Sequence, residues 1–373
     1  MLKGLKCFNG IFAKISLNIF KMIGESSPDQ AIFMDSITQI TPGAALGESL
    51  LGKKIGYRAA AWGALLGTVP DLDVLANPFL DSVSEISFHR GFTHSLLFCL
   101  VASPLFGFVI NYLQKKWEVG WKKWTQFSFL VFITHILLDV QTTYGTQVFY
   151  FFTDRPVTTD SIFIIDPAYT FTLLIGLIPA LFLNRESKAR SLLNNGGLLI
   201  STLYLVWALG IKAHVHSVFD ASFENQYGYY DQIKTTPNGP TTFLWTGYII
   251  RGDTVYQSVY SIFDEDTDLQ FRPIPRNTEL IEEHKEDRAT ETLLWFSRGF
   301  YTVEEEQSTL VFYDLRFGRS DLWLTDGQQA ELVWKNYILF DEDGNATGID
   351  QSTPSFDTRS SIFSRFIRRI KGE

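Results

Sequence analysis

Apolar residues gather in six stretches within the first 215 positions of this 373-residue chain, and short polar loops separate them. The stretches are Ile37–Leu51, Ala59–Val69, Ser95–Leu113, Phe127–Val140, Ala168–Leu183 and Gly197–Ala213. A bilayer core needs about 20 apolar residues of helix, so Ser95–Leu113 is a good spanning segment. The first two stretches are short enough to form a half-inserted hairpin instead. Several such runs in close succession favour a membrane bundle of about four to six apolar helices over buried helices of a soluble protein.

From about residue 216 onward the pattern changes to short aromatic and β-branched runs that alternate with polar residues. The runs are Thr241–Ile250, Thr254–Phe263, Leu293–Val303, Leu310–Leu315 and Leu332–Phe340. Turn signals such as Pro237-Asn238-Gly239 separate them, which is typical of strands in a sheet. The chain is therefore predicted to be an α membrane protein followed by a β-rich, α+β extramembrane domain.

These patterns divide the chain into a membrane part at 34–215, a β-rich soluble domain at 216–350, and a linker with a basic tail at 351–373. The tail segment Ser361–Ile370 is predicted to be an amphipathic basic helix that lies on a membrane, or else a frayed charged end. Residues 1–33 carry four lysines within an apolar pattern, which favours an amphipathic surface helix over a signal peptide. A further interpretation is that synthesis starts at Met34 and that the extension is not native.

Lysine and arginine are concentrated in alternate loops. They follow the first, third and fifth stretches, whereas the loops 71–93 and 141–167 hold only Arg90 and Arg155. Because cytoplasmic loops carry the excess of lysine and arginine, the loops after the second and fourth stretches are predicted to face outward. The sequence thus predicts a multi-pass protein of the inner (cytoplasmic) membrane whose C-terminal domain lies outside the cytoplasm.

The overall charge limits the classes of binding partner, and the cysteine content limits disulfide bonding. A net charge of −9 argues against nucleic acid, which usually needs a basic face. The two cysteines, Cys7 and Cys99, argue against a disulfide framework and leave the redox compartment open. The lipid bilayer is the partner that the sequence indicates, and the oligomeric state is left open.

Three motifs carry chemistry: Pro70–Asp73, His89–Ser95, and His135 with Asp139. A His and an Asp four positions apart share one face of a helix, and imidazole with carboxylate suits zinc, manganese or iron. Each motif alone is weak evidence, because a lone His at a helix end is usually a capped or satisfied core residue and Asp71 and Asp73 fit an ordinary turn. The loop charges place all three at the outward face, where ionisable residues against a membrane segment are costly and usually functional. The predicted ligands are Asp71, Asp73, His89, His94, His135 and Asp139, with Asp35, Gln39 and Asp166 as additional candidates on the same face.

These motifs resemble those of the YdjM-type family of membrane-bound metal-dependent hydrolases. The resemblance rests on Asp35–Gln39, Gly43–Glu48, Pro70–Asp73, His89–Ser95 and His135–Asp139. It starts at Met34 and covers about residues 34–210, and the downstream domain looks like the C-terminal part of a longer subgroup. It implies a membrane location and a divalent metal. Gln39 departs from the pattern, since many relatives carry His there.

The resulting hypothesis is hydrolysis by water that a divalent ion activates, with zinc as the first choice and manganese as the second. Arg90 and Asp73 are the predicted catalytic residues. Arg90 either holds an anionic group or forms a salt bridge to Asp71 or Asp73. A site at the bilayer face suggests a phosphoester or lipid-linked substrate. The alternative is a non-catalytic membrane protein with a structural metal site and an outward domain that binds a ligand or partner. A transporter fits less well, because the ionisable residues cluster at one face.

Overall fold

The computed structural model describes residues 28–307, 309–325, 330–352 and 360–373, although the side chains of 28–36, 360 and 361 lie outside this description. Most of the predicted N-terminal extension, residues 1–27, also lies outside it. The chain divides into two compact units, Met34–Ala213 and a second unit that contains His214–Glu373. The described part is helical first and then rich in antiparallel sheet, so the predicted α+β architecture is confirmed.

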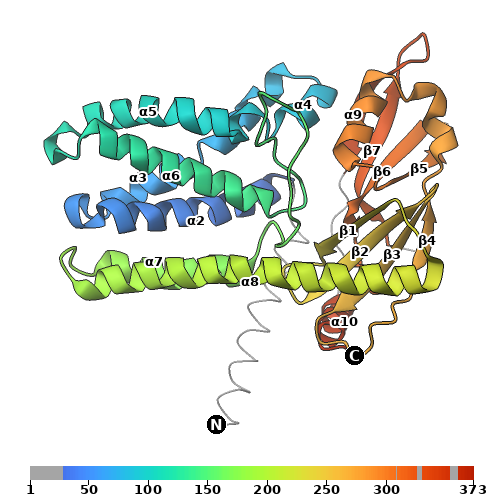
Figure 1. Cartoon of the computed structure of the whole chain (residues 1–373). Helices are drawn as coiled ribbons and strands as arrows, with labels where there is room; N and C mark the ends of the chain where they lie inside the picture. The colour runs from blue at the N-terminus through green and yellow to red at the C-terminus, as the bar shows by residue number, and fades with distance from the viewer. Residues whose placement is uncertain (1–27, 308, 326–329, 353–359) are drawn as a thin grey trace. The chain divides into compact units, whose positions relative to one another are not determined.

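The first unit is built of helices (Figure 1). They are α2 (Pro28–Ile55), α3 (Arg58–Gly67), η1 (Pro70–Phe79), α4 (Ser82–Phe88), η2 (Phe92–His94), α5 (Leu96–Leu113), η3 (Lys115–Trp117), α6 (Trp121–Val140), α7 (Pro167–Phe182) and α8 (Lys188–Tyr227), whose residues from His214 onward belong to the second unit. Each of the six apolar stretches falls in one of the longer helices. Helix α8 continues to Tyr227, so the boundary predicted at residue 215 falls inside a helix. Its last part keeps helical spacing of buried side chains at Val215, Phe219 and Phe223.

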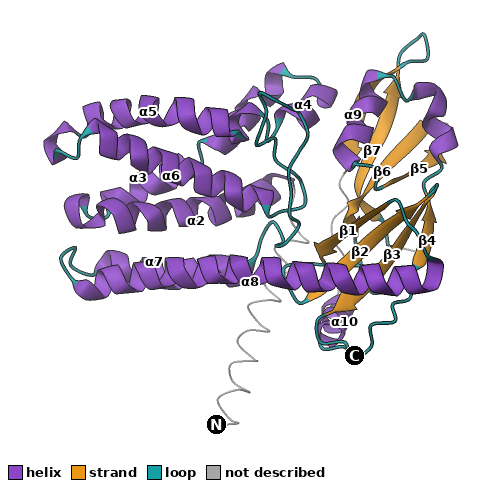
Figure 2. Cartoon of the chain, viewed as in Figure 1, coloured by secondary structure: helices purple, strands orange, loops and turns teal. Residues whose placement is uncertain are grey.

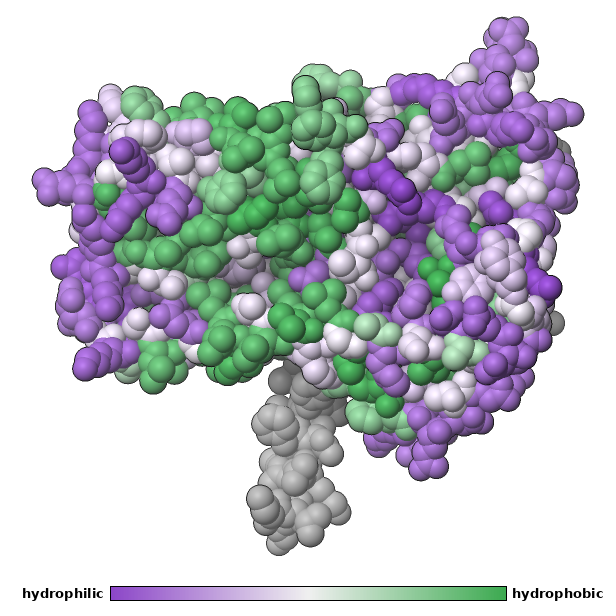
Figure 3. All heavy atoms as spheres, viewed as in Figure 1, coloured by the Kyte–Doolittle hydropathy of each residue, from purple (hydrophilic) through white to green (hydrophobic). Residues whose placement is uncertain are grey.

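Two described helices, α5 and α8, are long and apolar enough to cross a membrane, and the pair α3 and η1, bent by 45°, makes a third if it counts as one span. Helix α7 is apolar but shorter. Figure 3 shows a broad hydrophobic surface over the helices of this unit. Hydrophilic residues border this surface at the end of the unit where the turns α2–α3, α5–α6 and α7–α8 lie (Figures 1 and 3). An apolar belt with polar ends is the surface that a bilayer requires.

Helices α2 and α3 pack through glycines that let the two backbones touch. A Cβ atom added at Gly63 would lie 2.0 Å from the carbonyl oxygen of Gly43, and one added at Gly47 would lie 2.1 Å from that of Ala59. Small residues at such crossings are typical of membrane helix pairs, because close backbone approach maximises van der Waals contact. The hairpin of α2 and α3 therefore depends on the small-residue character of its sequence.

We expect Gly63→Ala to destabilise the protein by about 1–3 kcal/mol, the cost of inserting a methyl group into a filled contact. Gly196→Ala is the matched control, since a Cβ atom at Gly196 in α8 meets nothing within 4 Å. The control should leave stability unchanged or slightly raised, because Ala favours helix over Gly. Unfolding of the detergent-solubilised protein measures both variants, and equal stabilities would contradict the close packing described above.

Helix α6 packs along α5 and contributes the central side chains of this unit. Trp124, Phe127, Val131 and Phe132 of α6 are buried against Cys99, Ala102 and Ile110 of α5, and Trp62 of α3 contacts Trp124 edge-on. His135 and Asp139 lie further along the same buried side of α6. Apolar packing thus fixes the rotation of α6 and turns two ionisable side chains into the interior.

The second unit contains two four-stranded antiparallel sheets, each with its strands in chain order (Figure 2). The first holds β1 (Gln232–Pro237), β2 (Leu244–Arg251), β3 (Thr254–Ser261) and β4 (Arg272–Pro275). The second holds β5 (Tyr301–Glu306), β6 (Thr309–Arg319), β7 (Leu332–Phe340) and β8 (Ala346–Ser352). Strands β2, β3, β6 and β7 correspond to predicted runs, whereas β1, β4 and β8 are too polar or too short to have been recognised.

The predicted strand Leu293–Val303 is wrong in its first half. Helix α9 (Arg288–Ser297) occupies that part, and strand β5 begins only at Tyr301. Ala289, Leu293 and Phe296 are the buried apolar side chains of α9, and their spacing of four and three positions is that of a helix. The aromatic residues of this run suggested a strand. The helical spacing of buried residues begins at Ala289, before the predicted run, and indicates a helix.

The predicted amphipathic tail is a helix, α10 (Ser360–Ile370). Its apolar face packs within the second unit, where Ile362 and Phe366 are buried against Leu244 and Leu322. Arg369 adds an ion pair, with its Nη2 donating to Oδ2 of Asp264 over 2.6 Å. The face that was predicted to lie on a membrane is therefore occupied by the β-rich unit itself.

Candidate metal centre

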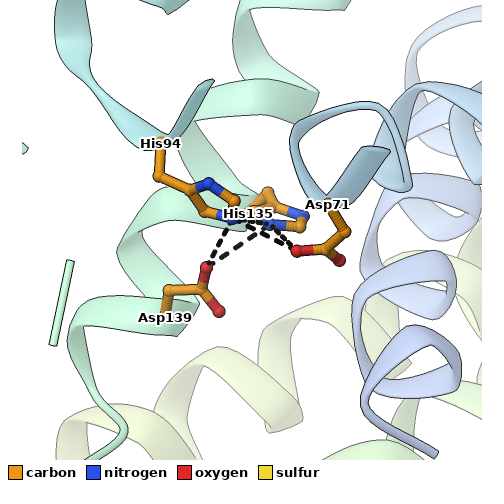
Figure 4. Close-up of side chains that lie close together, drawn as sticks. All are labelled: Asp71, His94, His135 and Asp139. Carbon is orange, nitrogen blue, oxygen red and sulfur yellow. Dashed lines mark hydrogen bonds and ion pairs between the residues drawn. The ribbon is translucent and has the colours of Figure 1, made fainter. Parts of the chain in front are cut away.

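Four ionisable side chains from three separate segments converge at one end of the first unit (Figure 4). Asp71 is at the start of η1, His94 is at the end of η2, and His135 and Asp139 are on adjacent turns of α6. Pro70 begins η1 directly after α3, which sets Asp71 against the end of α6. His94, His135 and Asp139 are fully buried, and 22% of the Asp71 side chain is exposed.

The distances among the four donor atoms are short and nearly equal. Nε2 of His94 lies 3.2 Å from Nε2 of His135 and 3.3 Å from Oδ2 of Asp139. Oδ1 of Asp71 lies 3.2 Å from Nε2 of His94 and 3.3 Å from Nε2 of His135, which is itself 3.4 Å from Oδ2 of Asp139. All four atoms lie within 4.8 Å of one another.

These separations match the edges of a small coordination polyhedron. Zinc–ligand distances of about 2.0–2.1 Å place the corners of a tetrahedron about 3.3 Å apart. Five of the six separations are 3.2–3.4 Å, and the pair of carboxylate oxygens makes the sixth. The donor set of two imidazoles and two carboxylates fits a divalent cation such as zinc or manganese.

The outer nitrogens of both imidazoles are held by acceptors. Nδ1 of His135 lies 2.7 Å from the carbonyl oxygen of Gly67, which only accepts, so Nδ1 carries the hydrogen. The Thr93 hydroxyl donates to Oδ2 of Asp73 and accepts from Nδ1 of His94 over 3.0 Å. In their neutral forms both imidazoles therefore turn the lone pair of Nε2 toward the centre, which is the arrangement of metal-binding histidines.

The centre as a whole calls for positive charge. Burial disfavours the charged form of His94, but the adjacent carboxylates of Asp139 and Asp71 outweigh burial and raise the pKa of His94. Oδ2 of Asp139 is buried, faces the two imidazoles and forms no regular hydrogen bond. Either a proton on one imidazole or a metal ion between the donors supplies this positive charge. Only the metal ion also accepts the Nε2 lone pairs of both His94 and His135.

Asp139 is held from its other side by two groups. Nε2 of Gln39 donates to Oδ1 of Asp139 over 2.6 Å, and Nη2 of Arg90 lies 3.4 Å from the same oxygen. Gln39, which was an additional ligand candidate, therefore turns its amide nitrogen toward a ligand carboxylate. It orients Asp139 and does not present its own oxygen to the centre.

The structure pairs the guanidinium of Arg90 with Asp139, where the sequence predicted a substrate anion or a salt bridge to Asp71 or Asp73. The side chain of Arg90 is 1% exposed, its Nη1 donates to the Thr142 hydroxyl over 2.9 Å, and its guanidinium stacks on the ring of Tyr144. Arg90 adopts a positive φ of 56°, and its backbone N–H donates to Oδ2 of Asp73. The buried guanidinium compensates the carboxylate charge of Asp139 in this conformation, and its Nε forms no hydrogen bond to a described residue.

Asp73 and His89 were predicted as ligands but lie beside the four-residue group. Asp73 is buried and accepts from the Arg90 backbone N–H, the Thr93 hydroxyl and, over 3.2 Å, from Nδ1 of His89. His89 contacts the ring of Tyr144 and is 29% exposed. Asp73 thus supports His94 through Thr93, which is the outer-partner role that tunes and orients a metal-binding imidazole.

The two remaining ligand candidates, Asp166 and Asp35, are not in the four-residue group. Oδ1 of Asp166 caps α7 by accepting from the backbone N–H groups of Ala168 and Tyr169, and its Oδ2 accepts from the Tyr204 hydroxyl over 2.7 Å. Asp166 is therefore a helix cap. The side chain of Asp35 lies outside the described residues. The carbonyl of Gly67 was missed, although the unsatisfied carbonyls in the last turn of a helix are a general signal for such a role.

Comparisons with known proteins agree with the motifs and the helices. The family model described as YdjM inner membrane protein matches residues 34–215. Inner membrane protein YbcI of Escherichia coli (strain K12) is 34% identical over 113 residues. That match covers 30% of this chain and 63% of the relative, so the chain spans less than two thirds of that protein. No solved structure matches the chain. Through residues 34–215, the chain belongs to the YdjM family of inner membrane proteins.

Proposed function

We propose that this inner membrane protein is a metal-dependent hydrolase. The observation that carries the proposal is the convergence of two imidazole nitrogens and two carboxylate oxygens at 3.2–3.4 Å in a buried centre. His94, His135, Asp71 and Asp139 hold a divalent ion, with zinc as the first candidate and manganese as the second. The bound ion supplies Lewis-acid activation of water and of the electrophile.

The protein's own groups fix this centre and open it on one side. Gly67, Thr93 and Asp73 hold the imidazoles, while Gln39 and Arg90 hold Asp139. Asp71 is the one member of the group with an exposed side chain, so substrate and water approach from its side. Arg90 acts in the resting state by balancing the carboxylate charge, and contact with a substrate anion requires it to leave Asp139.

The substrate that we propose is a phosphoester with lipid character. The segments that build the centre also expose large aromatic side chains. Phe79 ends η1 with 89% exposure, and Phe152 has 86% exposure in the loop after α6. Phe92 of η2 is also exposed and contacts the ring of Tyr150. Large exposed apolar side chains beside the centre are typical of a surface that contacts lipid, which supports a substrate with lipid character.

We further propose that the centre faces outward. The turns at the opposite end of the first unit carry most of its lysines and arginines, which favours the cytoplasm for that end. Six helices, namely α2, α3, α5, α6, α7 and α8, then form four to six membrane-inserted segments, and the second unit lies outside the cytoplasm.

The test is hydrolysis by the detergent-purified full chain after metal removal and reloading with zinc or manganese. We expect release of phosphate or of the headgroup from long-chain phosphoesters to exceed that from short-chain ones. Asp71→Asn should lower the rate by more than about 100-fold, because it replaces a metal ligand and loss of an outer partner alone costs about 10–100-fold. Asp166→Asn is the matched control, since Asn caps helices as well as Asp, and it should keep the parent rate.

The alternative is a structural metal site in a non-catalytic protein. One observation favours it: four protein donors fill a tetrahedron, whereas catalytic zinc usually has three protein ligands and an open position. Stoichiometric metal without hydrolysis of any ester tested would support this alternative. Loss of hydrolysis in Asp71→Asn with retained metal would contradict it.

A further inference from the structure

The turns at the end of the first unit opposite the metal centre enclose a second site. Its open pocket, of about 510 Å³, is lined by Arg58, Ala61, Trp62, Leu65, Leu113, Gln114, Lys115 and Lys116. Helix α5 begins beside His94 and ends at this pocket, so its 18 residues separate the two sites by about 27 Å. The pocket is therefore independent of the metal centre and of any reaction there.

The polar lining of the pocket is cationic. Arg58, Lys115 and Lys116 contribute three positive charges, and none of the lining residues is acidic. The guanidinium of Arg58 lies over the rings of Tyr57 and Trp117, at 4.9 and 5.3 Å from their centroids. Within the described residues Arg58 has no carboxylate partner, so aromatic rings hold this guanidinium while its donors stay available for an anion.

The other part of the lining is apolar and continues along the helices. Ala61, Trp62 and Leu65 follow Arg58 at helical spacing on one face of α3. Leu113 ends a line of exposed side chains on α5 that includes Val109, Leu105 and Val101 at intervals of four residues. A ligand that fits both parts has an anionic head and a long apolar chain.

We propose that this pocket binds the phosphate headgroup of an anionic phospholipid, with an acyl chain along the exposed face of α5. Basic pockets between membrane helices recognise anionic headgroups, and each lysine or arginine near the surface contributes on the order of a fivefold gain in affinity. Guanidinium matches phosphate oxygens bidentately, and the two ammonium groups add point charges. The proposal requires only that the unit is embedded in a bilayer.

The test is lipid titration of the detergent-purified full chain, followed by native mass spectrometry. We expect phosphatidylglycerol to bind more tightly than phosphatidylcholine with the same acyl chains. The triple variant Arg58→Gln, Lys115→Gln, Lys116→Gln should lower the affinity for the first bound phosphatidylglycerol molecule by about 100-fold. The matched control is Lys53→Gln, Lys122→Gln, Lys123→Gln, which removes the same charge from the same end of the unit outside the pocket lining. The affinity of this control for phosphatidylglycerol should stay within about threefold of that of the parent.

Three outcomes would overturn the proposal. Equal losses in the two triple variants would show general charge attraction, and equal binding of the two lipids by the parent would show no headgroup recognition. Displacement of phosphatidylglycerol by millimolar inorganic phosphate would indicate a site for a soluble anion. If the pocket variant fails to fold, the double variant Lys115→Gln, Lys116→Gln changes only two exposed side chains. This double variant should still lower the affinity for phosphatidylglycerol by about 30-fold.

Discussion

Replacing His135 with Ala should remove the bound metal from the purified chain. The change deletes one of four donors and leaves the carbonyl of Gly67 without its hydrogen bond. Loss of an outer partner of a metal ligand costs about 10–100-fold in metal affinity, so loss of the ligand itself should exceed 100-fold. Elemental analysis of protein purified without chelator measures this as a fall from about one ion per chain to a trace.

His89→Ala and His284→Ala are the informative comparisons. His89 lies next to Asp73 and outside the four-residue group, so its loss should lower metal affinity by at most the 10–100-fold of an outer partner. His284 pairs with Asp287 in the second unit and should have no effect on metal content. Equal loss of metal in His89→Ala and His135→Ala would move His89 into the coordination set and contradict the assignment. A parent protein without metal would contradict the centre altogether.

The sequence carried enough information to bring the right motifs to one end of the membrane unit, but not to separate ligands from their supports. Asp71 and Asp73 look alike in sequence, because both follow Pro70 in a turn. Their difference depends on which way a 3₁₀ turn points each side chain: Asp71 faces the imidazoles, and Asp73 faces the backbone of Arg90 and the Thr93 hydroxyl. His89 and His94 are separated in the same way, since one is partly exposed and the other is buried.

The fold shows a similar limit. Hydropathy located the helices of the first unit because burial in a bilayer imposes a long apolar run. It did not show that α8 continues past the apolar part, since the buried positions after Ala213 are too widely spaced to raise mean hydropathy. The apolar face of α10 was recognised, but its partner was not. An amphipathic helix has the same pattern whether lipid or a protein core covers it, and here Leu244 and Leu322 cover it.

A buried ion pair between α2 and α8 makes the first unit sensitive to the loss of either partner. Nε and Nη2 of Arg190 donate to the two carboxylate oxygens of Glu48, each over 2.6 Å, and both side chains are at most 5% exposed. Nη1 of Arg190 also donates to the carbonyl of Leu183. Glu48→Ala would leave a buried guanidinium without its counter-charge, and we expect a loss of about 3–5 kcal/mol in the free energy of unfolding. Unfolding by SDS titration in mixed micelles measures it.

A double variant distinguishes the cost of an unpaired buried charge from the cost of lost packing between Glu48 and Arg190. Glu48→Met with Arg190→Met removes both charges and leaves apolar side chains of similar length, so it should recover most of the stability that Glu48→Ala loses. The exposed pair of Arg185 and Glu186, at 3.5 Å, serves as the matched comparison, and Glu186→Ala should give no measurable change. A double variant as unstable as Glu48→Ala would mean that the forked hydrogen bonds themselves hold α8 against α2. A stable Glu48→Ala would mean that water or lipid phosphate reaches Arg190, in conflict with its burial.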